Sequence, residues 1–213
     1  MTEEEDLQLA FFDLPVSPAH QLNIRAYLEI LRLKHRPTYE HSIRVGVLCL
    51  RAAQVLGLNS RALFWGGTLH DIGKALIDSR VLQKTSDFSQ KDYAAVRPHP
   101  ILGYRLLKGV HPYTAELVVR HHRFQPCPYP KRLPQSTIIW PKRTLVSFEK
   151  QARLLALVDF YDALTRRRNA KFVGGTKTNE QLRQIFYDSW EYPFSRREME
   201  RRLMSSTVCI SPD

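Results

Sequence analysis

Apolar residues recur at helical spacing along most of this 213-residue chain. Between residues 38 and 56, for example, Val45, Leu48, Ala52 and Val55 fall on one face of a helix. The same periodicity, bounded by capping residues and prolines, predicts further helices. These cover about 19–34, 60–73, 89–97, 100–107, 112–122 and 151–166, and two more helix starts fall at Thr178 and Ser195. We therefore expect an all-α fold.

One segment interrupts the helical pattern, because five of the thirteen prolines lie between residues 126 and 141. The runs STIIW (136–140) and TLVSF (144–148) are typical of short strands. They predict a small β-hairpin around 136–148 with a basic tip at Lys142 and Arg143, although an irregular proline-rich loop is the alternative. The fold class is all-α in either case.

The length of the chain suits one well-buried core. We expect an N-terminal tail over residues 1–16 that docks through a few apolar side chains, one domain over 17–205, and a C-terminal tail over 206–213. The docking side chains of the N-terminal tail would be Leu7, Leu9, Phe11 and Phe12.

Charge narrows the class of partner. The chain has 32 Lys and Arg residues against 21 Asp and Glu residues, a net charge of +11, which favours nucleic acid, a nucleotide or another anion. No apolar run reaches the ~18 residues of a spanning helix, and the acidic start MTEEED is unlike a secretory signal. The three cysteines are far apart, which excludes a disulfide scaffold and a cysteine zinc site. We expect a cytoplasmic protein without a membrane partner.

Histidines mark the candidate chemistry. Five of the eight interrupt otherwise apolar helical segments, and these are His41, His70, His99, His121 and His122. Each alone has an ordinary explanation, such as a helix-capping imidazole or a surface pair. An imidazole supplies one nitrogen ligand to a metal ion, but each of these residues taken singly is only suggestive.

Two carboxylates strengthen this interpretation. Neighbouring helical residues point about 100° apart, so His70 and Asp71 can bind one ion only near a helix end, which Gly73 supplies. Asp159 lies in the apolar run LLALVDFYDAL, where a buried carboxylate needs a metal ion, a cation or several donors. A buried aspartate that caps a neighbouring helix is the alternative for Asp159. Asp162 lies three residues on and shares its face.

Taken in order, these residues resemble the HD superfamily of metal-dependent phosphohydrolases. The sequence HDIG at 70–73, the pattern His-Pro-x-x-Gly at 99–103 and the pair His121-His122 are similar to its HD-GYP branch, the cyclic-dinucleotide phosphodiesterases. The resemblance runs from about residue 41 to 171 and implies an HD-domain helical bundle.

The resemblance also implies roles. His41, His70, Asp71 and Asp159 would hold one metal ion, and Asp71 would bridge to a second ion held by His99, His121 and His122. Fe or Mn would suit this donor set, with Zn, Ni or Mg as alternatives. Asp71 and Lys74 would be the catalytic residues. Five residues would bind the substrate, and the catalytic lysine is one of them: Lys74, Tyr129, Asp162, Arg168 and Lys171.

The sequence departs from the branch after the paired histidines. The branch has a glutamate there and then a glycine-rich motif that ends in Gly-Tyr-Pro, whereas here only Tyr129-Pro130 remains and prolines replace the glycines. Some family members carry a glutamate for a third metal ion four residues before the first histidine. Here Pro37 occupies that position, which favours two ions.

We therefore expect hydrolysis of a phosphodiester in a nucleotide-type substrate, with a cyclic or linear dinucleotide as the first choice. The alternatives are an HDIG-type nucleotidase, an RNA phosphodiesterase, and a non-catalytic HD module that binds nucleotide or RNA. The proline-rich basic segment 123–150 would be a lid over the substrate or an interaction surface. The sequence leaves the oligomeric state open.

Overall fold

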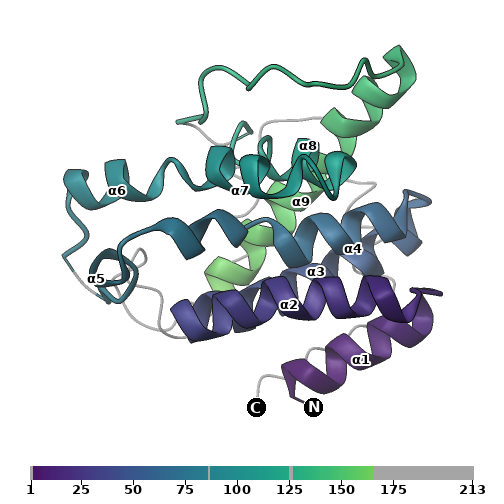
Figure 1. Cartoon of the computed structure of the whole chain (residues 1–213), viewed down its shortest axis with the longest axis horizontal. Helices are drawn as coiled ribbons and strands as arrows, with labels where there is room; N and C mark the ends of the chain where they lie inside the picture. Colours follow the sequence, from purple (N-terminus) through teal and green to yellow (C-terminus); the bar gives the residue numbers. More distant parts are fainter. Residues whose placement is uncertain (1, 86, 125–126, 166–213) are drawn as a thin grey trace.

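The structure is a computed structural model that describes residues 2–85, 87–124 and 127–165. Helices alone make up the regular structure of these residues, and no strand occurs among them, so the prediction of an all-α fold is confirmed (Figure 1). The elements are α1 (Glu3–Asp13), α2 (Pro18–Lys34), α3 (Arg36–Leu56), α4 (Ser60–Leu69), the 3-10 helix η1 (Ile72–Leu76), α5 (Ser79–Leu82), α6 (Gln90–Val96), α7 (His99–Leu107), α8 (Pro112–Val118) and α9 (Lys142–Thr165).

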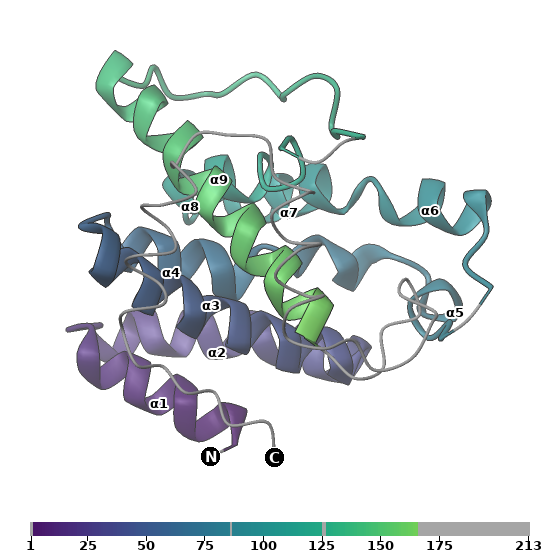
Figure 2. The same ribbon diagram turned by 180° about the vertical axis from the view of Figure 1, so that it is seen from behind.

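The long helix α3 organises the bundle. Helices α1, α2, α4 and α9 all contact it, and Figure 2 shows α9 running diagonally across α3 and α4. Glycines allow α3 and α4 to approach closely, because a Cβ atom on Gly67 would lie only 2.8 Å from the Cα atom of Gly46. This close approach brings the candidate ligand His41, on α3, near His70 at the end of α4.

The predicted β-hairpin is wrong. Residues 136–141 have no regular structure, and the TLVSF segment belongs to α9, which begins at Lys142 rather than near residue 151. The amide groups of Thr144 and Leu145 both donate to the carbonyl of Pro141 and so start the helix. Phe148 is fully buried against Tyr113, with ring centroids 4.6 Å apart. Packing thus outweighs the modest strand preference of the β-branched residues.

Most of the N-terminal segment, expected as a docking tail over residues 1–16, forms the helix α1. Thr2 and Glu5 form a capping box at the start of α1, whose acidic first turn suits the helix dipole. Leu7 and Phe11 are buried, as expected, whereas Leu9 and Phe12 face solvent. The helix starts predicted at residues 178 and 195 and the tail 206–213 lie outside the described residues.

Across the residues that the structure describes, no helix has both the length and the apolar character that a membrane span requires.

Candidate metal centre

Seven buried side chains converge at the centre of the bundle, although five separate segments supply them. His41 comes from α3, the adjacent pair His70 and Asp71 follows α4, and His99 begins α7. The turn after α8 supplies the two histidines 121 and 122, and α9 supplies Asp159. None of the seven is more than 9% exposed. The structure therefore brings together every metal ligand that the sequence analysis named.

A glycine fixes the separation of two of these segments. A Cβ atom on Gly73 would lie 1.9 Å from the carbonyl oxygen of His99 and 2.6 Å from the amide nitrogen of Gly103. Only a residue without a Cβ atom lets η1 and α7 approach this closely. As a result Asp71 lies near His99, with 3.3 Å between Oδ1 and Nε2.

The first group of donors lies on the α3 side of Asp71. His41 Nε2 is 3.0 Å from Asp159 Oδ1 and 3.7 Å from Asp71 Oδ2. His70 Nε2 is 3.4 Å from Asp71 Oδ2 and 3.6 Å from Asp159 Oδ1. Two imidazole nitrogens and two carboxylates thus face one point, and His41, His70 and Asp71 satisfy the geometry of a metal-binding group.

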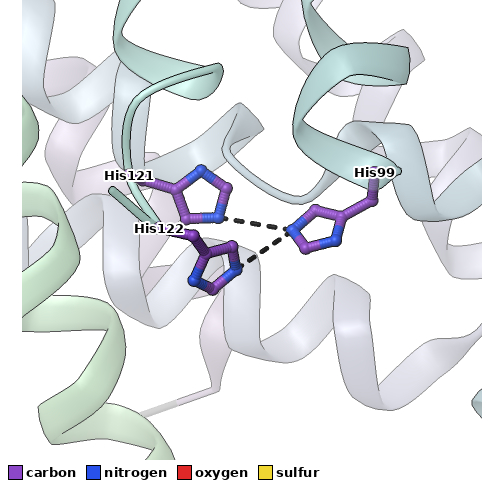
Figure 3. A group of neighbouring side chains, drawn as sticks. All are labelled: His99, His121 and His122. Carbon is purple, nitrogen blue, oxygen red and sulfur yellow. Dashed lines mark hydrogen bonds between the residues drawn. The ribbon is translucent and has the colours of Figure 1, made fainter. Parts of the chain in front are cut away.

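The second group consists of three imidazole rings. His99 Nε2 lies 3.4 Å from His121 Nε2 and 3.2 Å from His122 Nε2, as Figure 3 shows. These rings also satisfy the geometry of a metal-binding group. Because Asp71 turns Oδ1 toward His99 and Oδ2 toward the first group, its carboxylate lies between the two groups.

The hydrogen bonds of the rings fix their tautomers. Nδ1 of His70, His99 and His121 lies 2.6–2.8 Å from the carbonyl oxygens of Gly67, Val96 and Val118, respectively. A carbonyl only accepts, so each Nδ1 carries a proton, and in the neutral ring, the form that binds a metal ion, Nε2 presents a lone pair. Two such lone pairs cannot bond to each other, and the short contacts between them fit a shared cation.

Unsatisfied polar atoms support the same conclusion. His70 Nε2 and Asp71 Oδ1 are fully buried, and neither has a hydrogen bond to any group in the described residues. A buried polar atom without a partner costs free energy. Imidazole nitrogen and carboxylate oxygen are donors that divalent transition metals prefer. The residues present therefore fit a metal ion.

The charges of the centre call for a cation. Burial raises the pKa of Asp71 and of Asp159, but Lys74 and His70 beside Asp71, and His41 and His70 beside Asp159, hold both pKa values well below the usual range. Burial lowers the pKa of His70, and the two carboxylates outweigh that effect and raise it to about 10. The aspartates are therefore ionised and attract positive charge.

The second group has the opposite balance. Burial lowers the pKa of His99 and of His122 well below the usual range. Burial and the neighbouring His70 lower the pKa of His121 to about 4. These three rings are therefore neutral near pH 7, which is the form that binds a metal.

Two further predicted residues lie beside the centre. Lys74 Nζ donates to Asp71 Oδ2 over 2.6 Å, and its side chain is 22% exposed. The Tyr129 ring stacks on His122, with centroids 4.4 Å apart and planes at 28°.

Asp162, a predicted substrate-binding residue, lies behind the His41 ring. It is buried, accepts a hydrogen bond from His41 Nδ1 over 2.6 Å, and pairs with Arg44 Nε at 2.8 Å. A carboxylate behind a ligating histidine orients the ring and fixes its tautomer. This place fits a residue that positions His41 better than one that touches the substrate.

Arg44 was missed by the sequence analysis. It joins Asp162 to Glu3 of α1, with 3.0 Å between Nη1 and the Glu3 Oε1 atom. The sequence indicates only that Arg44 lies near His41, because it follows His41 by three residues and so shares its helix face. Two other predicted substrate-binding residues, Arg168 and Lys171, lie outside the described residues.

Comparisons with known proteins agree with this centre. The family model described as "HD domain" matches residues 38–165. A 3'3'-cGAMP-specific phosphodiesterase of Vibrio cholerae is 27% identical over 195 residues, which are 84% of this chain and 42% of the relative. A cyclic di-GMP phosphodiesterase of Pseudomonas aeruginosa is 32% identical over 169 residues, 75% of this chain and 38% of the relative.

A third relative is named for a different activity. Ribonuclease Y of Geotalea uraniireducens is 30% identical over 131 residues, 56% of this chain and 22% of the relative. The chain thus spans between 22% and 42% of the length of these relatives.

Proposed function

This chain belongs to the HD-domain family, and from that premise we propose that it is a metal-dependent phosphohydrolase that cleaves a phosphodiester in a nucleotide-type substrate. The observation that carries the proposal is the pair of buried donor groups that share Asp71. Relatives named as phosphodiesterases support the enzyme class, and their names favour a cyclic or linear dinucleotide as the substrate.

The proposed metal ligands follow from the two groups. His41, His70, Asp71 and Asp159 would hold one ion, and Asp71 would share a second ion with a set of three imidazoles: His99, His121 and His122. Fe or Mn suits this mixture of nitrogen and oxygen donors, with Zn, Ni or Mg as alternatives. Metal ions held by these residues would supply Lewis-acid polarisation of the phosphoryl oxygens and an activated water nucleophile.

The protein's own groups complete the site. The carboxylate of Asp71 keeps the two donor groups in a fixed relation, because each of its oxygens faces a different group. Lys74 places a positive charge beside that carboxylate, where it would neutralise the charge that develops on the phosphoryl oxygens. The resemblance adds Arg168 and Lys171 as further phosphate contacts. Tyr129 forms a wall of the second group.

RNA phosphodiesterase activity is the second candidate. Two observations favour it: the similarity to ribonuclease Y and the net charge of +11, which exceeds what a small dinucleotide needs. A non-catalytic nucleotide-binding module is the third candidate, but the complete set of seven donors argues for a working metal centre. A cytoplasmic location goes with all three, because nucleotides and RNA are made in that compartment.

One substrate screen separates these candidates. The metal-reconstituted protein is incubated with cyclic di-GMP, 3'3'-cGAMP, nucleoside monophosphates, a short single-stranded RNA and bis(p-nitrophenyl) phosphate. We expect turnover of the aryl diester and of at least one cyclic dinucleotide, and a loss of about 10² or more in His70→Ala. Circular dichroism shows whether that variant is folded.

Other outcomes point elsewhere. Cleavage of RNA without cleavage of the dinucleotides would establish the second candidate in place of the first. Tight RNA binding that weakens steeply with salt, with no turnover of any substrate, would overturn the enzyme proposal in favour of a binding module.

A further inference from the structure

Arg97 lies at the edge of the second donor group without a role in the function proposed so far. It caps the C-terminus of α6, two residues before the candidate ligand His99. The carbon atom of its guanidinium group is 5.9 Å from the centroid of the Tyr129 ring. That ring stacks on His122 and lies 6.1 Å from His99. Arg97 thus contacts Tyr129, which in turn contacts the candidate metal ligand His122.

The charge of Arg97 has no ion-pair partner within the described part of the chain. Its side chain is exposed, and among residues 2–85, 87–124 and 127–165 no carboxylate forms an ion pair with it. Other arginines of the bundle differ, since Arg25, Arg44 and Arg120 each pair with a glutamate. An arginine held against an aromatic ring beside a phosphohydrolase centre, with its charge unpaired, is available to a ligand.

Tyr129 supplies the flat, neutral part of the same surface. Burial raises the pKa of its hydroxyl group, so the side chain stays uncharged. Nucleobases stack on tyrosine rings and on guanidinium planes, and arginine also donates two parallel hydrogen bonds to base edges. Phosphate would be bound by charge alone and would not need the ring.

We propose that Arg97 and Tyr129 form a subsite that holds the base of a second nucleotide unit, the unit joined to the scissile phosphate. This inference rests on the proposed function and deepens it: the subsite would make the centre prefer dinucleotides to simple phosphodiesters. Arg97 acts here as a specificity residue that contacts the substrate away from the reacting atoms.

The first test compares two substrates in one variant. In Arg97→Ala, kcat/KM for the dinucleotide falls about tenfold more than kcat/KM for bis(p-nitrophenyl) phosphate, as the loss of one stacked base predicts. Arg97→Lys keeps the charge but loses the plane, and it resembles Arg97→Ala. The matched control is Arg105→Ala, which removes an exposed arginine from α7 and leaves kcat/KM unchanged for both substrates.

Two outcomes of this comparison would overturn the subsite. Equal losses for both substrates would assign Arg97 to the metal centre or to the shared phosphate. Full activity of Arg97→Lys on the dinucleotide would show that charge alone matters, and hence that a phosphate lies there instead of a base.

A binding measurement separates failure of the subsite from failure of the proposed function. Fluorescence anisotropy of a fluorescein-labelled linear diguanylate is measured in EDTA, so that no metal ion contributes. We expect Kd to rise about tenfold in Arg97→Ala and about tenfold in Tyr129→Leu. Because the two residues contact one base, the fold-increase in Kd of the double variant should be smaller than the product of the two single fold-increases. Equal Kd values for wild type and Arg97→Ala, or no binding by wild type, would overturn the subsite. Absence of all turnover with an intact Kd difference would overturn only the proposed function.

Discussion

At the scale of single residues, the centre depends on one carboxylate between two groups of donors. Asp71 is 1% exposed and turns each oxygen toward different histidines. Replacing it should therefore affect both groups at once.

Metal content tests this dependence. We expect the wild-type protein to bind about two ions per chain and Asp71→Ala to bind less than one, because both proposed sites lose a ligand. Inductively coupled plasma mass spectrometry after dialysis measures the content. Asp78→Asn, at an exposed carboxylate that pairs with Arg80, serves as the control and keeps the wild-type content. Unchanged content in Asp71→Ala would contradict the shared site.

Lys74 tests the chemistry separately from metal binding. We expect Lys74→Met to retain its metal and to lose about 10²-fold or more in kcat, as the removal of a group that stabilises transition-state charge does elsewhere. The control is Lys108→Met, which removes an exposed lysine at the end of α7. A variant with wild-type kcat would remove Lys74 from the mechanism.

The sequence predicted the members of the centre but not all of their relations. The residue types of His70, Asp71 and Asp159, set in apolar runs, suggested a site for a cation, and the resemblance to the HD superfamily supplied the full set of predicted ligands. The direction in which Asp162 points was not predictable, because a shared helix face does not determine which neighbour a carboxylate reaches. Its partners His41 and Arg44 precede it by 121 and 118 residues in the sequence.

At the scale of elements, the contact between η1 and α7 sets the distance between the donor groups. The absent side chain of Gly73 is what permits the contact, since its Cβ position is occupied by the backbone of α7. The chain between η1 and α7 includes α5 and α6, so it does not by itself fix the distance between them. The contact at Gly73 therefore determines where His99 lies.

A pair of glycine variants tests this control. We expect Gly73→Ala to lower the free energy of unfolding by about 2 kcal/mol or more, because backbone atoms must move apart to admit the methyl group, and to reduce metal content as well. Gly109→Ala, where a Cβ atom would meet open space, should change the stability by less than about 0.5 kcal/mol. Urea unfolding of the metal-free proteins gives both values. Equal free energies of unfolding for Gly73→Ala and Gly109→Ala would show that η1 and α7 can move apart without loss of stability.

The elements were predicted best where local signals and packing agree. The N-terminal boundary of α6 follows from its Ser89 and Asp92 capping box, and α2 starts at Pro18 beside the capping Ser17. The start of α9 was predicted wrongly because β-branched residues dominate the local signal there. The deciding contacts of Phe148 are with Tyr113 and Trp140, which a local pattern does not contain.

At the scale of the whole molecule, α1 contributes to the core of the bundle. Phe11 is 3% exposed and meets Phe64 of α4 edge to face, with centroids 5.9 Å apart. Its neighbour Phe12 is 86% exposed. The sequence alone did not separate these two residues, because a docked tail gives no fixed period.

The two phenylalanines form a matched pair for experiment. We expect Phe11→Ala to cost about 3–5 kcal/mol of stability, through lost burial and the cavity that remains. Phe12→Ala should stay within about 0.5 kcal/mol of the wild type. Thermal and urea unfolding of the full chain provide the comparison, and similar values for both variants would mean that α1 is not docked in solution.

The chain of contacts from Glu3 through Arg44 and Asp162 to His41 connects that helix to the first donor group. Effects between two coupled sites are reciprocal: if docking of α1 favours the binding-competent position of His41, metal binding favours docking by the same free energy. Addition of Mn²⁺ should therefore slow hydrogen exchange of the α1 amides, and Arg44→Gln should abolish the slowing while α2 amides stay unchanged. The N-terminal helix would then report the occupancy of a centre that it does not touch.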